Sequence, residues 1–132
     1  AAWDAPSSVT NFGGAEVSNG VLLNMTEKTQ AVTAAATTTI NFALGPVVLL
    51  SHGTDISSLV FTNFGAAGKA ATMTIIRTKD NSGTARTINW GSVLFPGGTD
   101  PTLTQTANAV DVITLISTNG TQIVGSSASA FA

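Results

Sequence analysis

The sequence predicts an all-β protein, an antiparallel β-sandwich or jelly-roll-like domain with an extended N-terminal arm. Thr, Val and Ile dominate from Gly20 onward, and these β-branched side chains suit a pleated surface. Turn residues interrupt this pattern about every six to twelve positions, which is typical of sandwiches and barrels. The segment 71–78 alternates apolar residues with Thr72 and Thr74, as a half-buried strand does.

Residues 1–19 are predicted to form the arm, because Pro6, Gly13 and Gly14 break any periodicity. The arm carries three apolar residues that are candidate assembly contacts: Trp3, Val9 and Phe12. It either packs on its own domain or reaches a neighbouring subunit.

Residues 20–132 are predicted to form one β-domain, a length that can bury a sizeable core. Asp80 to Gly83 has the chemistry of a turn, so the segments 71–78 and 84–90 are expected to pair as a hairpin. Asn119-Gly120 predicts a second, two-residue hairpin after the apolar run that starts at Val110. The candidate strands are 20–25, 28–34, 37–43, 46–51, 57–63, 70–79, 84–90, 102–106, 109–118 and 121–127.

The composition excludes several classes of protein. Only 9% of the residues are charged, against about 25% in an average soluble domain, and the net charge is −2. The absence of Cys excludes disulfide scaffolds and Cys-based zinc sites. The chain also lacks the excess of basic residues that nucleic-acid binding requires. The longest apolar run, 46–50, is far shorter than the ~20 residues of a membrane helix. A neutral hydroxyl-rich surface favours self-association.

The sequence contains few residue patterns that would indicate an enzyme. Ser51, His52 and Asp55 spell a triad on paper, but adjacent strand residues point to opposite faces, so Ser51 and His52 should diverge. A histidine at a strand end before a Gly turn is the expected role of His52. The stretch 65–69 lacks the hydroxyl residue of a Walker loop after Lys69. We therefore expect no catalytic residue, no cofactor and no metal site.

The acidic residues are scattered, and no two are spaced as paired catalytic carboxylates. Asp55, Asp80 and Asp100 are interpreted as turn residues that bond nearby backbone amides. Asp111 lies within the most apolar strand, so it should pair with Arg77 or Arg86 if it is buried.

Trp90 and Phe95 flank a loop, where their rings could either stack on sugars or pack in the core, the latter being favoured. The candidate loop contacts are Phe95, Pro96 and Asp100. Two function classes follow from the residues: a structural subunit of an oligomeric assembly, or a β-module that binds carbohydrate or a receptor.

An ordered set of segments carries a family resemblance over roughly four-fifths of the chain. These segments are 21–27, the 68–70 lead into the strand 71–78, 88–90, 95–103 and 107–114. In this order they resemble a small β-domain of tailed-phage virion proteins, of the marine phage and cyanophage type. Similar domains often carry a Trp-Tyr-Gly-like sequence near the last strand, where this chain has no aromatic residue between Gln122 and Ser126.

The resemblance implies a non-enzymatic virion component, located on the capsid surface or the tail. A capsid cement or decoration protein that binds the outer shell as a homotrimer and stabilises it is the first expectation. Its partners would be the major capsid protein or other virion proteins, with no nucleic acid and no membrane. A tail-fibre or receptor-binding domain, with a host surface glycan as ligand, is the alternative. Residues 1–19 are expected to contribute to the anchoring.

Overall fold

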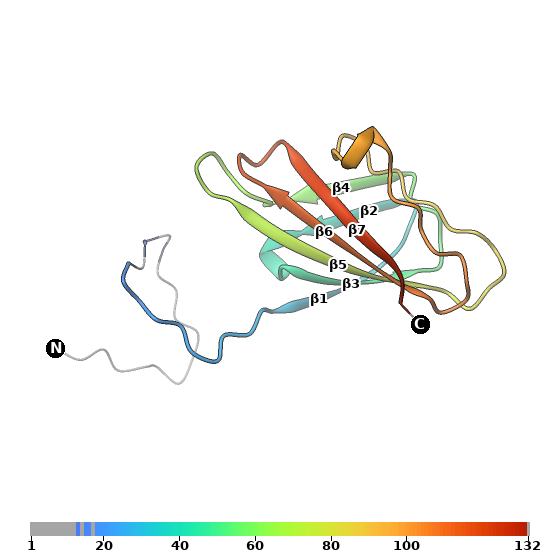
Figure 1. Cartoon of the computed structure of the whole chain (residues 1–132), viewed down its shortest axis with the longest axis horizontal. Coiled ribbons are helices and arrows are strands. Elements are labelled where there is room, and N and C mark those ends of the chain that lie inside the picture. The colour runs from blue at the N-terminus through green and yellow to red at the C-terminus, as the bar shows by residue number, and fades with distance from the viewer. Residues whose placement is uncertain (1–12, 14, 17, 132) are drawn as a thin grey trace.

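A computed structural model describes residues 13, 15–16 and 18–131 of the chain. The described residues confirm the all-β prediction, since they form strands and two short 3-10 turns (Figure 1). The strands are β1 (Thr29–Thr33), β2 (Thr37–Asn41), β3 (Val47–His52), β4 (Ser58–Thr62), β5 (Ala71–Lys79), β6 (Val110–Ser117) and β7 (Ile123–Phe131). The 3-10 turns are η1 (Phe42–Leu44) and η2 (Pro96–Gly98).

From β1 to β5 the chain alternates between two sheets. The large sheet has the order β1-β3-β5-β6-β7, and the small sheet pairs β2 with β4. The expectation of antiparallel pairing is wrong for β1–β3, β3–β5 and β2–β4, which run parallel. The chain crosses to the other sheet between two successive strands of the same sheet. It therefore re-enters that sheet at the same end, and the two strands run parallel. Jelly rolls are antiparallel throughout, so these parallel ladders depart from that connectivity.

Among the strands of the described residues, β5–β6 and β6–β7 are the antiparallel pairs. The hairpin predicted between 71–78 and 84–90 is wrong, because β5 takes β6 as its antiparallel partner. Residue Ile88 instead forms a single parallel bridge with Ile56. The hairpin at Asn119-Gly120 joins β6 to β7, although its loop covers residues 118–122 rather than two residues.

Three further candidate strands differ from the structure. The segments 84–90 and 102–106 are loops apart from the bridge at Ile88. The segment 20–25 forms no strand, and residues 18–29 are all exposed. Propensity alone predicted these strands, but a strand also needs a hydrogen-bonded neighbour. The first such neighbour along the chain is met at Thr29.

The core lies between the two sheets. It is built from the inward residues of both, and its fully buried members include Ile40 of β2, Ile75 of β5 and Leu115 of β6. Trp90 and Phe95 close one side with an edge-to-face contact at 5.3 Å between ring centroids. The expectation that both rings pack in the core is thus confirmed.

Candidate functional site

The outward face of the large sheet, called the outer face below, carries no charged residue. Alternation along each strand places one residue in two on this face. Its apolar members include Leu49, Ile116 and Val124, each between 42% and 46% exposed. The remaining members are hydroxyl or aliphatic residues and one phenylalanine: Thr29, Ala31, Thr33, Val47, Ser51, Thr72, Thr74, Ile76, Thr78, Val110, Val112, Thr114, Ser126, Ala128 and Phe131.

The charged residues of the large sheet point the other way. Arg77 and Lys79 of β5 and Asp111 of β6 are at most 1% exposed. Burying a charge is costly unless it is paired, so this arrangement needs dedicated partners inside the protein. The large sheet therefore has its charged residues on the core side, whereas an ordinary half-exposed sheet has them on the solvent side.

Arg77 and Asp111 are partners in a buried network that leaves one guanidinium nitrogen, Arg77 Nη2, without a hydrogen-bond partner among the described residues. The Nη1 atom of Arg77 donates to Asp111 Oδ2 at 2.9 Å and to the carbonyl of Thr104 at 2.6 Å. Asp111 also accepts from the amide and hydroxyl of Thr104 and from the amide of Ala130. This confirms the predicted pairing of Asp111 with Arg77, and it ties the loop at Thr104 and the end of β7 to the sheet.

Opposing effects act on the Asp111 carboxyl. Burial works to raise its pKa, but the hydrogen bonds from Thr104 and Ala130 and the charge of Arg77 outweigh it. The pKa of Asp111 therefore lies below its ordinary value, and the carboxylate stays ionised at neutral pH. Burial also lowers the pKa of the Arg77 guanidinium, against the opposing influence of Asp111.

His52 is held neutral at the edge of this network. Its Nδ1 accepts a hydrogen bond from Arg77 Nε at 2.8 Å, so its Nε2 carries the proton and donates to the Thr87 carbonyl at 3.2 Å. Burial and the charge of Arg77 lower the pKa of His52 to about 4. With both nitrogens engaged, His52 has no free position from which to act as a base.

The triad that can be written from the sequence is not assembled. His52 is buried, whereas the Ser51 side chain lies on the exposed outer face, as the alternation of a strand predicts. Asp55 accepts from the Thr87 amide at 2.9 Å and does not hydrogen-bond to the imidazole. The expected divergence of Ser51 and His52 is confirmed.

Asp80 differs from its expected role as a capping turn residue. Its carboxylate pairs with Lys79 and Arg86 and accepts from the Ser82 hydroxyl. The hydrogen bonds from Arg86 and then Lys79 hold the pKa of Asp80 well below its usual range, and Asp80 raises that of Arg86. Arg86, the other candidate partner of Asp111, is therefore taken by Asp80.

The predicted loop contacts divide into two groups. Phe95 is only 7% exposed, so its ring packs on Trp90 and is not presented to a partner. That placement corrects its role as a candidate loop contact, and it follows from Gly125, whose missing side chain leaves room for the ring. Pro96 and Asp100 are exposed. The candidate assembly contacts Trp3, Val9 and Phe12 lie outside the described residues.

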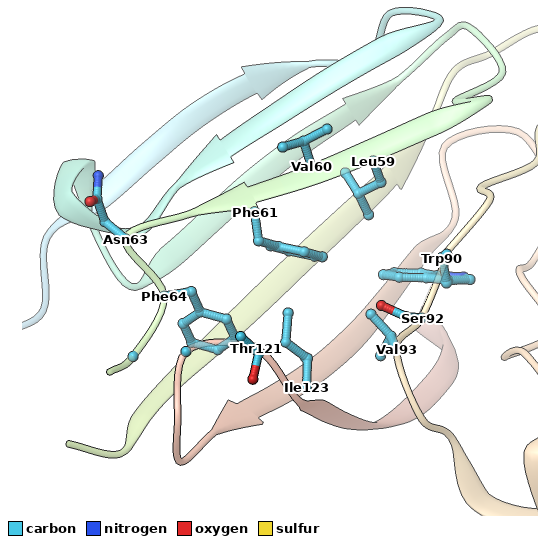
Figure 2. A pocket seen from close by; sticks show the side chains of 13 residues that line it. Leu59, Val60, Phe61, Asn63, Phe64, Trp90, Ser92, Val93, Thr121 and Ile123 are labelled. Atoms are coloured by element: carbon cyan, nitrogen blue, oxygen red, sulfur yellow. The ribbon is translucent and has the colours of Figure 1, made fainter. Parts of the chain in front are cut away.

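A groove of about 380 Å³ opens between β4 and the segment 90–93 (Figure 2). Phe61 of β4 and Phe64 just after it project into the groove, and so does Ile123 of β7. Its lining residues are apolar or uncharged: Leu59, Val60, Phe61, Asn63, Phe64, Gly65, Trp90, Gly91, Ser92, Val93, Gly120, Thr121 and Ile123. Sequence reasoning missed this groove, because segments distant along the chain create it.

Among the described residues, no cluster of three or more His, Asp or Glu side chains could hold a metal ion. No helix of the described part of the chain is long and apolar enough to cross a membrane. Comparison of the chain with protein-family models, with curated proteins and with solved structures gave no match.

Proposed function

We propose that this chain is a non-catalytic structural protein of a bacteriophage virion. In this proposal it is a cement or decoration protein that binds the outer shell as a homotrimer and stabilises it. The sequence resemblance supplies the virion setting and the trimer. The two facing sheets are classed here as a small β-sandwich with unequal layers.

The charge-free outer face carries the proposal. A sheet face of Thr, Val, Leu and Ile can lie against a protein shell without burying an unpaired charge. Exposed apolar area of this kind marks interaction surfaces. Since Arg77, Lys79 and Asp111 are turned inward, the sheet keeps its ionic interactions out of the interface. Many modest contacts, repeated over a shell, add up through avidity.

The first test is the copy number of the protein in purified particles, measured by quantitative mass spectrometry against the major capsid protein. About one copy per capsid subunit supports the cement function. A ratio lower by one or two orders of magnitude indicates the alternative, a tail-fibre or receptor-binding component. Absence from the particles would overturn the virion assignment.

A pair of matched variants tests the outer face itself. Thr114→Lys places a charge at the centre of this face, and Thr39→Lys places the same charge on β2 in the small sheet. Both threonines are exposed strand residues, so neither variant should unfold the domain. We expect Thr114→Lys to lose particle binding while Thr39→Lys retains it. Equal binding by the two variants would contradict docking through this face.

A further inference from the structure

Both edges of the small sheet lack a neighbouring strand among the described residues, because β2 and β4 pair only with each other, and the β4 edge is the one beside the groove. Within the described residues β4 pairs only with β2, so its other edge is open apart from the bridge at Ile56. The Ser58 amide bonds toward the β2 side, to the Ala36 carbonyl. Because main-chain groups alternate along a strand, those of Leu59 and Phe61 point toward the opposite edge. That edge borders the groove shown in Figure 2.

The segment 88–93 explains why the edge is open. It begins beside β4 as a third strand would, with hydrogen bonds from Ile56 to the Thr87 carbonyl and from Asn89 to the Ile56 carbonyl. At Gly91, with φ of 62°, the chain turns away. The space that a third strand would fill is therefore left as the groove.

An unpaired apolar segment matches this unpaired edge. Val21, Leu22 and Leu23 are 94%, 72% and 84% exposed, and the chain around them runs away from the strands (Figure 1). The sequence of this segment predicts a strand, but the described residues of its own domain supply no neighbour for it. Three adjacent large apolar side chains are rarely left in water on a functioning protein.

We propose that Val21–Leu23 of one copy adds as a strand to the β4 edge of a second copy and fills its groove. Strand addition to a free edge gives main-chain hydrogen bonds, and alternate side chains enter the pockets below. Neither the groove lining nor residues 18–26 contain a charged residue, so no charge is buried in the contact. The proposal concerns contacts between copies and does not depend on the virion assignment.

A second copy fits better than the chain's own groove. The arm leaves the domain at β1, where buried Gln30 bonds the carbonyls of Asn41 and Gly45 and fixes its base. In this structure Val21 and Leu23 stay 94% and 84% exposed, so the arm does not fill its own groove. The left-handed Asn24, with φ of 56°, turns the chain shortly before β1, and the chain there runs away from the strands (Figure 1).

A contact of this kind joins different surfaces of the two copies, an arm on one and a groove on the other. Such head-to-tail contacts close into rings when the rotation permits. A closed ring of three copies satisfies every arm and every groove.

Sedimentation of the full chain at about 100 μM tests the proposal, a concentration at which even a contact of micromolar affinity is formed. We expect wild type to be oligomeric at this concentration, and in a dilution series we expect Leu23→Asp to dissociate at concentrations at least about tenfold higher than wild type does. Thr26→Asp adds the same charge at a polar arm position and should leave the oligomer intact. Both changes lie outside the strands, so circular dichroism should be unchanged.

The groove side has its own matched pair. Val60→Lys charges the free strand, and Thr39→Lys charges its register partner on β2. Only Val60→Lys should dissociate the oligomer. A monomeric wild type, or an oligomer unaffected by both Leu23→Asp and Val60→Lys, would overturn the proposal. Leu23→Asp keeps the test decisive should Val60→Lys perturb the strand.

Cross-linking identifies the contact directly, because the chain has no Cys of its own. Leu23→Cys mixed with Ser92→Cys should give a disulfide-linked pair of chains on oxidation. Leu23→Cys mixed with Leu49→Cys, on the outer face, should not. If the double variant L23C/S92C forms its disulfide within one chain, even when diluted, the arm folds back on its own groove and exchange between copies is wrong.

Discussion

Arg77 and Asp111 occupy directly paired positions on β5 and β6, and their side chains meet at 2.9 Å inside the protein. A cross-strand ion pair usually lies on the solvent side of a sheet. Here it lies on the core side, where Thr104 and Ala130 donate to Asp111 and the Thr104 carbonyl accepts from Arg77.

Removing one partner of the pair should be severe. Asp111→Ala leaves the Arg77 guanidinium buried without its counter-charge, and we expect a loss of about 3–5 kcal/mol in the free energy of unfolding. Urea denaturation measures it. The matched control is Asp55→Ala, which removes an exposed carboxylate that accepts a hydrogen bond from the Thr87 amide and should cost far less. Equal losses would show that burial of the Arg77 pair does not set its importance.

Stability should depend on pH through the single histidine. His52 has a pKa of about 4 in the folded protein and about 6.5 when unfolded, so the unfolded chain binds more protons between these values. The contribution of His52 is complete above pH 6.5, and it falls by up to about 3 kcal/mol as the pH drops to 4.

Chemical denaturation at pH 7 and at pH 5.5 isolates this effect from the carboxylates, most of which titrate lower. His52→Gln can still accept from Arg77 and donate to the Thr87 carbonyl, yet it does not titrate. We expect the loss of stability between these two pH values to disappear in this variant. The same loss in both proteins would contradict the role of His52.

Gly45 should be irreplaceable at the base of the arm. Its φ is 147°, and an added Cβ would lie 2.5 Å from the carbonyl oxygen of Lys28. We expect Gly45→Ala to destabilise the fold by about 1–3 kcal/mol, measured by thermal unfolding. Gly83→Ala is the control, because its Cβ would meet no atom within 4 Å. An unchanged thermal stability in Gly45→Ala would mean that the backbone at Lys28 moves aside at little cost.

Gly125 should be coupled to Phe95. A Cβ at Gly125 would lie 2.6 Å from the Phe95 ring and 2.7 Å from Leu115, so Gly125→Ala overpacks the core by about 1–3 kcal/mol. Phe95→Leu should relieve part of that strain. A double-mutant cycle measures the coupling, and strict additivity of the two changes would show that the ring and the glycine act separately.

Deleting residues 1–19 tests the anchoring function of the arm. We expect the truncated protein to keep the circular dichroism of a folded β-domain but to leave the particles. Full decoration by the truncated form would show that the shell contact does not need these residues. The variant still contains Val21–Leu23, so it separates anchoring to a shell from contact between copies.

The sequence alone predicted the segments that form the seven strands, but it did not predict which strands pair or in which direction. The alternation around Met73 and Ile75 identified β5, and the polar residue inside an apolar run singled out Asp111. Parallel pairing was missed because local propensity is the same for either direction. The choice depends on the chain crossing between sheets after β1 and β3, which short turn motifs do not encode.

The candidate sites show the same division. The failure of Ser51 and His52 to meet followed from strand alternation, which is a local rule. The burial of Phe95 depends on Gly125, thirty positions away, and the open edge of β4 depends on the turn at Gly91. Contacts between residues this far apart in the sequence form only when the sheets assemble, so local sequence patterns do not predict them.

The order of strands in the large sheet also has a kinetic consequence. Among the paired strands of the large sheet, only β6 and β7 are joined by a short loop, whereas β5 and β6 pair residues 32 to 46 positions apart. Contacts between distant segments form slowly, so the β6–β7 hairpin is expected early in folding and the β5–β6 pairing late. The Arg77–Asp111 ion pair joins β5 to β6. A newly made chain would thus match its buried charges only in the step that completes the large sheet.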